Sequence, residues 1–115
     1  MIDTQDNRAK GYEAYWAADY ETALRLFMPF ARQGDAEVQC AVGSMYQLGL
    51  GVEVDCQAAM EWYLKSGRQG YGLAYNNLAS MYVTGCANLE PDAEQAGTYY
   101  RKAAENGFRV VTSCG

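Results

Sequence analysis

The sequence repeats itself at an interval of about 36 residues, and this repeat restricts the possible folds more than any other feature. Shifted by 36, the run from Ser44 to Gly49 matches the run from Ser80 to Gly85 at Ser, Met, Tyr and Gly. After one inserted residue, Asp55–Gly70 matches Asp92–Gly107 at Asp, Ala, Tyr, Lys and Gly. A diverged third copy precedes them, with Asp, Ala, Gln and Gly at the corresponding positions of residues 19–34. Similarity at a fixed period of this size indicates stacked helical or strand units.

Each copy has the pattern of two helices. In the first half of the second copy, Val38, Ala41, Val42 and Met45 recur at intervals of three and four, which is the spacing of one helix face. A turn with Gly49 and Gly51 follows, where glycine permits a positive φ. We expect aspartates to cap the second helices and glycines to end them. These residues are Asp19, Asp55 and Asp92 for the caps, and Gly34, Gly70 and Gly107 for the ends.

The two later copies resemble the Sel1-like repeats, a branch of the tetratricopeptide-like helical repeats. The copy at 36–70 supplies Gly43, Tyr46, Gly49, Gly51, Val52, Asp55, Ala59, Trp62, Tyr63, Lys65 and Gly70. The copy at 72–107 supplies Leu78, Tyr82, Gly85, Asp92, Ala96, Tyr100, Lys102, Ala103, Ala104 and Gly107. The family pattern has Gly and Val where Ala87 and Asn88 stand here.

The resemblance implies an all-α fold, a right-handed α–α superhelix, or solenoid, of about three helix-turn-helix repeats. We expect one domain over residues 1–115. It would hold a tetratricopeptide-like first unit at 3–34, Sel1-like repeats at 36–70 and 72–107, and a C-terminal tail at 108–115.

Charge and hydropathy limit the classes of partner that the chain is expected to bind and the compartment in which it is expected to occur. The net charge is −5 at pH 7 and there is no basic stripe, so nucleic acid is not expected to bind. No apolar run approaches the length of about 20 residues that spans a membrane. The N-terminal residues lack the apolar region of a signal peptide, which favours the cytoplasm. A periplasmic or secreted location remains the alternative if such a peptide was removed.

The four cysteines are Cys40, Cys56, Cys86 and Cys114, and the chain has no histidine. Their wide spacing is not that of a zinc site, so we expect no bound metal. Free thiols are the expectation, with disulfides as the alternative. In the family resemblance Cys40 stands at one position of a known Cys pair, but Gly67 and Ala104 occupy the partner positions. That disulfide is not expected, and Cys56 is interpreted as an ordinary residue after the Asp55 cap.

The lack of histidine also argues against an enzymatic function. Without histidine there is no Ser–His or Cys–His nucleophile pair, and no Ser-x-x-Lys sequence occurs. The acidic pairs Glu13/Glu21 and Glu90/Asp92 are interpreted as solvated helix ends. A thiol- or carboxylate-based hydrolase, with Cys40 as a reactive thiol, is therefore a disfavoured alternative. We expect no catalytic residues and no cofactor.

The family resemblance implies a non-enzymatic adaptor or scaffold whose first helices line a concave face. A peptide or protein segment would bind the first-helix positions that the core pattern leaves free. We call these positions the first-helix face: Arg8, Tyr12, Tyr15, Glu37, Cys40, Ser44, Gln47, Asn76, Asn77, Ser80 and Val83. One alternative is a solvated face with no ligand. Another is self-association, as a homodimer, through an uncapped C-terminal end with Phe108, Val110 and Val111.

Overall fold

The protein is described from a computed structural model, which covers residues 4–87 and 89–108 and, for side chains, residues 6–87 and 89–108. These residues form six α-helices of 13 residues each. Their bounds are α1 Thr4–Trp16, α2 Tyr20–Arg32, α3 Ala36–Leu48, α4 Cys56–Arg68, α5 Gly72–Thr84 and α6 Ala93–Glu105. The prediction of an all-α helical repeat solenoid is confirmed.

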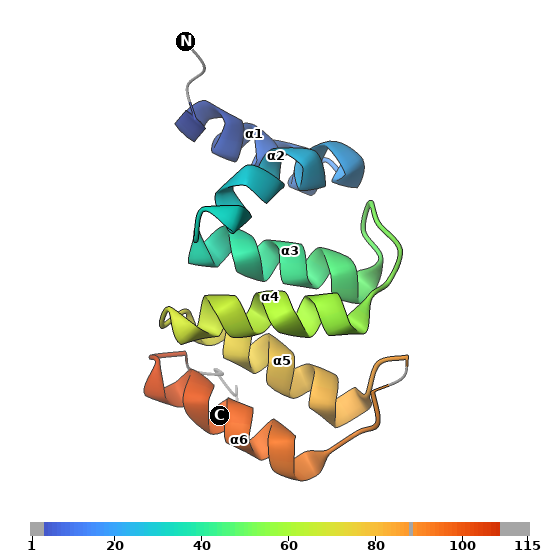
Figure 1. The fold of residues 1–115 in the computed structure, drawn as a ribbon, viewed down its shortest axis with the longest axis vertical. Coiled ribbons are helices and arrows are strands. Elements are labelled where there is room, and N and C mark those ends of the chain that lie inside the picture. The colour runs from blue at the N-terminus through green and yellow to red at the C-terminus, as the bar shows by residue number, and fades with distance from the viewer. Residues whose placement is uncertain (1–3, 88, 109–115) are drawn as a thin grey trace, which may run out of the picture.

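The helices stack as three antiparallel pairs along the longest axis of the molecule, from α1 and α2 at one end to α5 and α6 at the other (Figure 1). The chain extends 48 Å along that axis and about 30 Å across it. Within each pair, the connection between first and second helix lies on the same side of the stack, at the right in Figure 1. The connections between pairs lie on the opposite side. None of the helices in the described part of the chain is long and apolar enough to cross a membrane.

Helix ends agree with the sequence expectations, with one exception. Asp55 accepts a hydrogen bond from Ala58 N at 3.0 Å, and Asp92 accepts one from Gln95 N at 3.1 Å. Asp19 precedes α2 but makes no such bond, so its predicted capping is wrong. Asp35 instead caps α3, where its carboxylate accepts from Val38 N at 3.1 Å. The glycines predicted to end the second helices all have φ between 83° and 100°, as expected for the left-handed region.

Two apolar clusters hold the stack together. One centres on Phe27, Val42 and Met45 and joins the first pair to the second, and the other centres on Tyr63 and Leu78 and joins the second pair to the third. Packing within pairs is close because of small residues. A Cβ placed on Gly43 would lie 2.7 Å from Cδ1 of the Tyr63 ring, which is shorter than carbon atoms can approach. The absence of a side chain at Gly43 therefore allows α3 and α4 to approach closely.

The C-terminal segment is described only as far as Phe108. Its backbone N–H donates to Ala103 O at 3.0 Å. Its Cβ lies so near the start of α5 that a methyl group on Gly72 would approach it to 2.8 Å. Phe108 therefore packs back onto the last pair. Val110, Val111 and the rest of the predicted tail lie outside the described residues.

Candidate functional site

The first-helix face begins with Arg8 on α1. Its Nε donates to Asp35 Oδ2 at 2.7 Å, and its Nη2 lies 3.5 Å from Glu37 Oε2. The hydrogen bond to Asp35 raises the pKa of Arg8. Burial would raise the pKa of Asp35, but the bonds from Arg8 and Val38 N outweigh it and the pKa lies below its usual value. Arg8 is thus held by carboxylates of the next repeat, which leaves its guanidinium only partly available to a ligand.

The two α1 tyrosines of the face pack against the core. The ring centroid of Tyr12 lies 4.8 Å from that of Phe27, and the ring of Tyr15 lies 6.4 Å from it. Burial raises the pKa of both hydroxyls, and for Tyr12 the carboxylate of Glu37 adds to the rise. Each ring therefore presents a neutral, partly covered surface at neutral pH.

On α3 the face contains a hydrogen-bond chain. Tyr63 Oη, which comes from α4, donates to Gln47 Oε1 at 2.6 Å and lies 3.0 Å from Ser44 Oγ. Because the single tyrosine proton is given to Gln47, the serine hydroxyl is the donor in the second contact. Burial raises the pKa of Tyr63, so this proton is retained at neutral pH. Ser44 and Gln47 are thus fixed in position at the surface of α3.

Cys40 differs from the expectation for the face. Only 4% of the residue is exposed, and Asn77 Nδ2 points to its sulfur at 3.5 Å. Burial raises the pKa of the thiol to about 12. The placement of Cys40 as a groove-lining residue is corrected: it packs in the core because α5 lies directly over it. A buried, protonated thiol also lacks the properties of a nucleophile.

The α5 part of the face holds an unusual polar atom. Asn76 Oδ1 is buried yet has no hydrogen-bond partner among the described residues. One turn further on, Ser80 Oγ donates to Asn76 O at 3.1 Å and lies 3.4 Å from the Tyr100 hydroxyl. Val83 follows, with 52% of the residue exposed.

The structure links the three first helices through two side-chain contacts. Arg8 of α1 reaches Glu37 of α3, and Asn77 of α5 reaches Cys40 of α3. The predicted residues thus come from neighbouring helices of one stack. Whether they bind a ligand stays a prediction, which we take up below.

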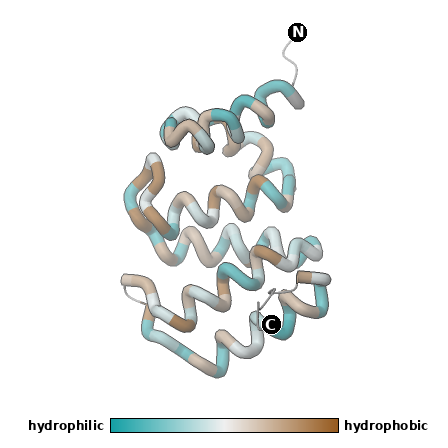
Figure 2. The backbone as a smooth tube through the Cα atoms, turned by 180° about the vertical axis from the view of Figure 1, so that it is seen from behind, coloured by the Kyte–Doolittle hydropathy of each residue, from teal (hydrophilic) through white to brown (hydrophobic). Residues whose placement is uncertain are grey.

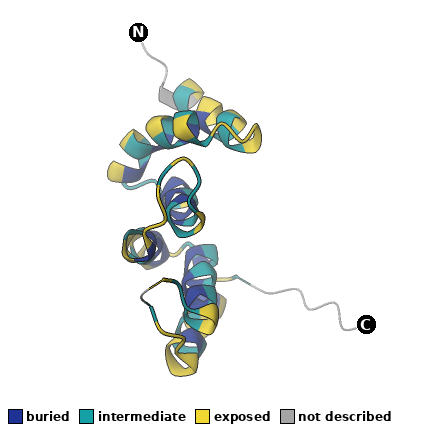
Figure 3. Cartoon of the chain, turned by 90° about the vertical axis from the view of Figure 1, so that its right-hand side faces the viewer, coloured by how far each residue is buried: buried dark blue, intermediate teal, exposed yellow. Residues whose placement is uncertain are grey.

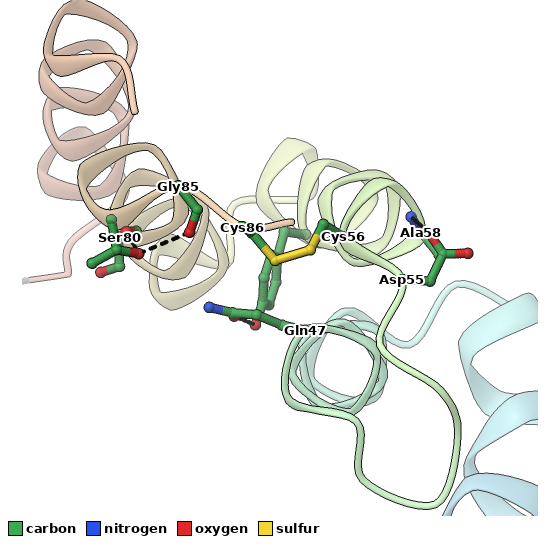
Figure 4. The surroundings of a disulfide bond; sticks show 9 residues. Gln47, Asp55, Cys56, Ala58, Ser80, Gly85 and Cys86 are labelled. Carbon is green, nitrogen blue, oxygen red and sulfur yellow. Dashed lines mark hydrogen bonds between the residues drawn. A yellow bond between two sulfur atoms is a disulfide. The ribbon is translucent and has the colours of Figure 1, made fainter. Parts of the chain in front are cut away.

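The cysteine expectation is wrong at two positions. Cys56 and Cys86 form a disulfide with a Cα–Cα distance of 6.1 Å. Figure 4 shows this bond between Cys56 at the start of α4 and Cys86 just after α5. The two positions are 30 residues apart and occupy different places in the repeat, so no single copy of the pattern reveals the pairing. Cys40 is a free thiol as expected, and Cys114 lies outside the described residues.

Beside the disulfide lies a cavity that sequence reasoning missed. It has a volume of about 700 Å³ and is lined by the α3–α4 loop, the α5–α6 loop and the helix ends next to them. Its wall includes Cys56, Cys86, Val54, Met60 and Leu89. The two valines of the α3–α4 loop, Val52 and Val54, are a sequence signal for it, because apolar residues are unexpected in a turn.

Comparison with known proteins gives the family. A sequence model described as Sel1 repeat matches residues 36–71 and 72–108. Human protein sel-1 homolog 2 is 34% identical over 83 residues, which are 72% of this chain and 12% of that protein. An uncharacterized protein of Neisseria meningitidis is 34% identical over 87 residues, or 76% of this chain and 17% of that protein. The chain thus spans less than a fifth of the length of these two relatives.

Two solved structures share the fold. A Sel1 repeat protein from Oxalobacter formigenes superposes with a TM-score of 0.78 at 36% identity, covering 88% of this chain and 41% of that one. A protective antigen present in uropathogenic Escherichia coli strains, displaying an SLR fold, gives a TM-score of 0.84 at 30% identity, covering 92% and 24%. With two adjacent matches to one repeat model and the same helical stack, the chain belongs to the Sel1 repeat family.

Proposed function

We propose that the protein is an interaction module that binds an extended segment of another protein along its first-helix face. Sel1 repeats generally mediate protein–protein interactions and are typically non-enzymatic scaffolds. The fold alone assigns no ligand, so the proposal depends on the chemistry of the face.

The observation that carries the proposal is the unpaired oxygen of Asn76. A buried polar atom without a partner costs free energy, about 1–3 kcal/mol, and a bound backbone N–H would recover it. Asn76 lies beside the surface turn of Ser80 on α5. Because the residue as a whole is only half-buried, rotation of its side chain would turn this acceptor toward a peptide laid across α5 and α3, beside the fixed side chains of Ser44 and Gln47.

The remaining face suits an extended segment because it is polar, nearly neutral and partly aromatic. Amides and hydroxyls pair with both the N–H and the C=O of a backbone, and tyrosine rings give contact area at low entropic cost. Arg8 is already paired with Asp35 and Glu37, so its charge does not by itself select an acidic ligand.

The test is a binding titration with a peptide selected from a displayed library of short random sequences. We expect Asn76→Ala to weaken binding of the selected peptide about tenfold, the value of one hydrogen bond at its upper range. Asn106→Ala is the matched control, because Asn106 is an exposed asparagine at the end of α6 that only bonds Lys102 O. Equal affinity of the wild type and Asn76→Ala would refute the assignment of this face.

The alternative of a homodimer through the C-terminal end is a separate hypothesis. Phe108, one of its three predicted contact residues, packs against the start of α5 instead of standing free. Sedimentation at increasing protein concentration tests it: a single monomeric species would exclude the dimer, and a concentration-dependent shift removed by truncation after residue 108 would establish it.

The disulfide gives an indication of the cellular compartment in which the protein occurs. Structural disulfides persist in oxidising compartments and are rare in the cytosol. We therefore infer a periplasmic or extracellular setting, the alternative to the cytoplasmic expectation from the N-terminal sequence. Fractionation of the source cells, followed by thiol labelling of the intact chain, would decide between them.

A further inference from the structure

Exposed apolar side chains gather on one edge of the stack. We define the loop edge as three segments at the connections within the helix pairs: residues 16–21, residues 48–58 and, leaving out residue 88, residues 83–95. Five large hydrophobic residues are exposed among the described residues, and four lie on this edge. They are Trp16 at 77%, Leu48 at 62%, Val54 at 53% and Val83 at 52% exposed. Figure 3 views the molecule from this edge, and Figure 2 shows the apolar run of the α3–α4 loop in brown.

The loop edge is also uniformly acidic. Its three segments contain no lysine or arginine, yet they carry seven of the 14 acidic residues of the chain. These acids are Asp19, Glu21, Glu53, Asp55, Glu90, Asp92 and Glu94. Part of the cause is helix chemistry, because acidic residues stabilise the N-termini of second helices, which all start here.

The opposite edge carries charges of both signs, with Asp35, Glu37 and Glu105 among its basic residues. The last turns of the second helices carry Arg32, Lys65, Arg68 and Lys102. The last turns of the first helices, which end at the loop edge, carry no basic residue. The loop edge is thus the purely acidic edge of the stack, and a cationic partner is drawn to it.

The cavity beside the disulfide gives this edge a recess. Its apolar lining includes Val52, Val54, Met60 and Leu89, and its two carboxylates belong to Glu53 and Asp55. A volume of about 700 Å³ accommodates one or two large side chains. The recess lies between two repeats, so its shape depends on how the α3–α4 and α5–α6 loops are held relative to each other.

From these observations we propose that the loop edge binds a basic, apolar segment of a partner protein. A large apolar side chain of that segment enters the cavity, and flanking lysine or arginine residues face Glu53 and the other edge carboxylates. This surface is different from the first-helix face, with only Val83 belonging to both.

The Cys56–Cys86 disulfide holds the two walls of this site together. Both cysteines line the cavity, and their bond ties the start of α4 to the loop after α5. Breaking the bond frees the two walls to separate, so the bound segment loses its fitted recess. The proposal therefore includes weaker binding by the reduced protein.

The probe for the test is a labelled hexapeptide with Leu-Phe flanked by two lysines on each side. One comparison peptide replaces Leu-Phe with Ser-Ser, and another replaces the lysines with glutamates. We expect saturable binding of the first peptide and affinities at least about tenfold lower for both others. Equal binding of the Ser-Ser peptide would show attraction by charge alone and overturn the role of the cavity. Absence of binding at about 1 mM would overturn the site itself.

Variants locate the binding. Glu53→Lys should weaken binding of the Leu-Phe peptide about tenfold, because it reverses an exposed carboxylate at the mouth of the cavity. Glu105→Lys is the matched control, since it makes the same charge change at the exposed end of α6, near the opposite edge, and should leave affinity unchanged. An equal loss in both variants would reduce the effect to net charge and refute the site.

The disulfide arm uses Cys56→Ser with Cys86→Ser, measured at a temperature where circular dichroism shows the variant folded. We expect binding to fall several-fold while helicity is kept, and Val54→Ser, which leaves the disulfide intact, should reproduce the loss. Unchanged binding by both the double serine variant and Val54→Ser would refute the role of the cavity in binding. Asn76→Ala should not affect this probe, so the loop edge can fail or succeed independently of the first-helix face.

Discussion

The two junctions between neighbouring repeats are built differently, although the repeats share one pattern. At the first junction, the α3–α4 loop lies against the start of α2 so closely that a Cβ on Gly51 would come within 2.6 Å of Tyr20 C. Arg8 adds an ion pair to Asp35 across the same boundary. At the second junction the corresponding connection is covalent, through Cys56 and Cys86.

This difference shows that neighbouring repeats can stack through similar apolar faces and still have different contacts at the edges of the junction. The inner contacts are similar, because each junction has its own apolar cluster and Tyr46 packs against both. The outer contacts are a close glycine and a surface ion pair in one case, and a disulfide in the other. The junction with the covalent connection is the one that holds the cavity.

Of the changes that test the two junctions, loss of the disulfide should have the largest effect on stability. We expect Cys56→Ser with Cys86→Ser to lower the free energy of unfolding by about 2–4 kcal/mol, because the unfolded chain gains the freedom of an open loop. Urea unfolding measures this, with reduced wild type as an independent check that should show the same loss. Identical midpoints for oxidised and reduced protein would mean that the bond does not stabilise the second junction.

Gly51→Ala tests the first junction and should have the next largest effect. Gly51 has a φ of 73°, and the added methyl group would meet backbone atoms of Tyr20, which cannot rotate away. We expect a loss of about 1–3 kcal/mol in thermal unfolding. Gly97→Ala in α6 is the matched control: nothing lies within 4 Å of its Cβ, and helix propensity predicts a gain of up to about 1 kcal/mol. A neutral Gly51→Ala would show that the loop moves freely.

The ion pair of the first junction should contribute less. Asp35→Asn keeps a good helix cap but removes the charge facing Arg8, and we expect a loss of up to about 1 kcal/mol at pH 7. The pKa of Asp35 is lowered in the folded state, so its stabilisation is present above the unfolded pKa of about 3.9 and disappears as the pH falls through the folded value. The difference in stability between wild type and variant should therefore begin to shrink below about pH 4 and vanish only below the lowered folded pKa. A constant difference at all pH values would assign the effect to packing.

The prediction with the smallest effect on the protein is slow chemical labelling of Cys40, which lies at the contact of α3 and α5. With its pKa raised to about 12, the thiol should be alkylated at pH 8 roughly a thousandfold more slowly than an exposed cysteine. Mass spectrometry of the peptide containing Cys40 measures the rate, with urea-unfolded protein as the reference. Rapid labelling in the folded protein would show that α5 opens away from α3.

Much of the fold could be predicted because its signals are local. Capping by Asp55 and Asp92, the ends at Gly34 and Gly70, and the close approach at Gly43 each depend on residues a few positions apart or on one helix pair. Asp19 was the exception, since it shares the spacing of the other caps but makes no capping bond. The preference of aspartate for such positions is a tendency that tertiary contacts can override.

The candidate sites were less predictable because they depend on contacts between repeats. Cys40 has the spacing of a first-helix surface residue, but the arrival of α5 over it makes it part of the core. Asn76 looked like any polar surface residue until packing buried its oxygen. In both cases the deciding neighbour lies on another helix.

The repeated stretches from Gly49 to Gly70 and from Gly85 to Gly107 were enough to predict the helix pairs, their turns and the family. The same short-range pattern of caps, turns and apolar residues occurs in both stretches. The pairing of Cys56 with Cys86, the cavity beside it and the gathering of acidic residues on one edge came only with the stacking of the pairs. A periodic sequence specifies each unit through short-range spacing. The contents of a junction depend on which residues two units bring together, and these residues are distant in the chain.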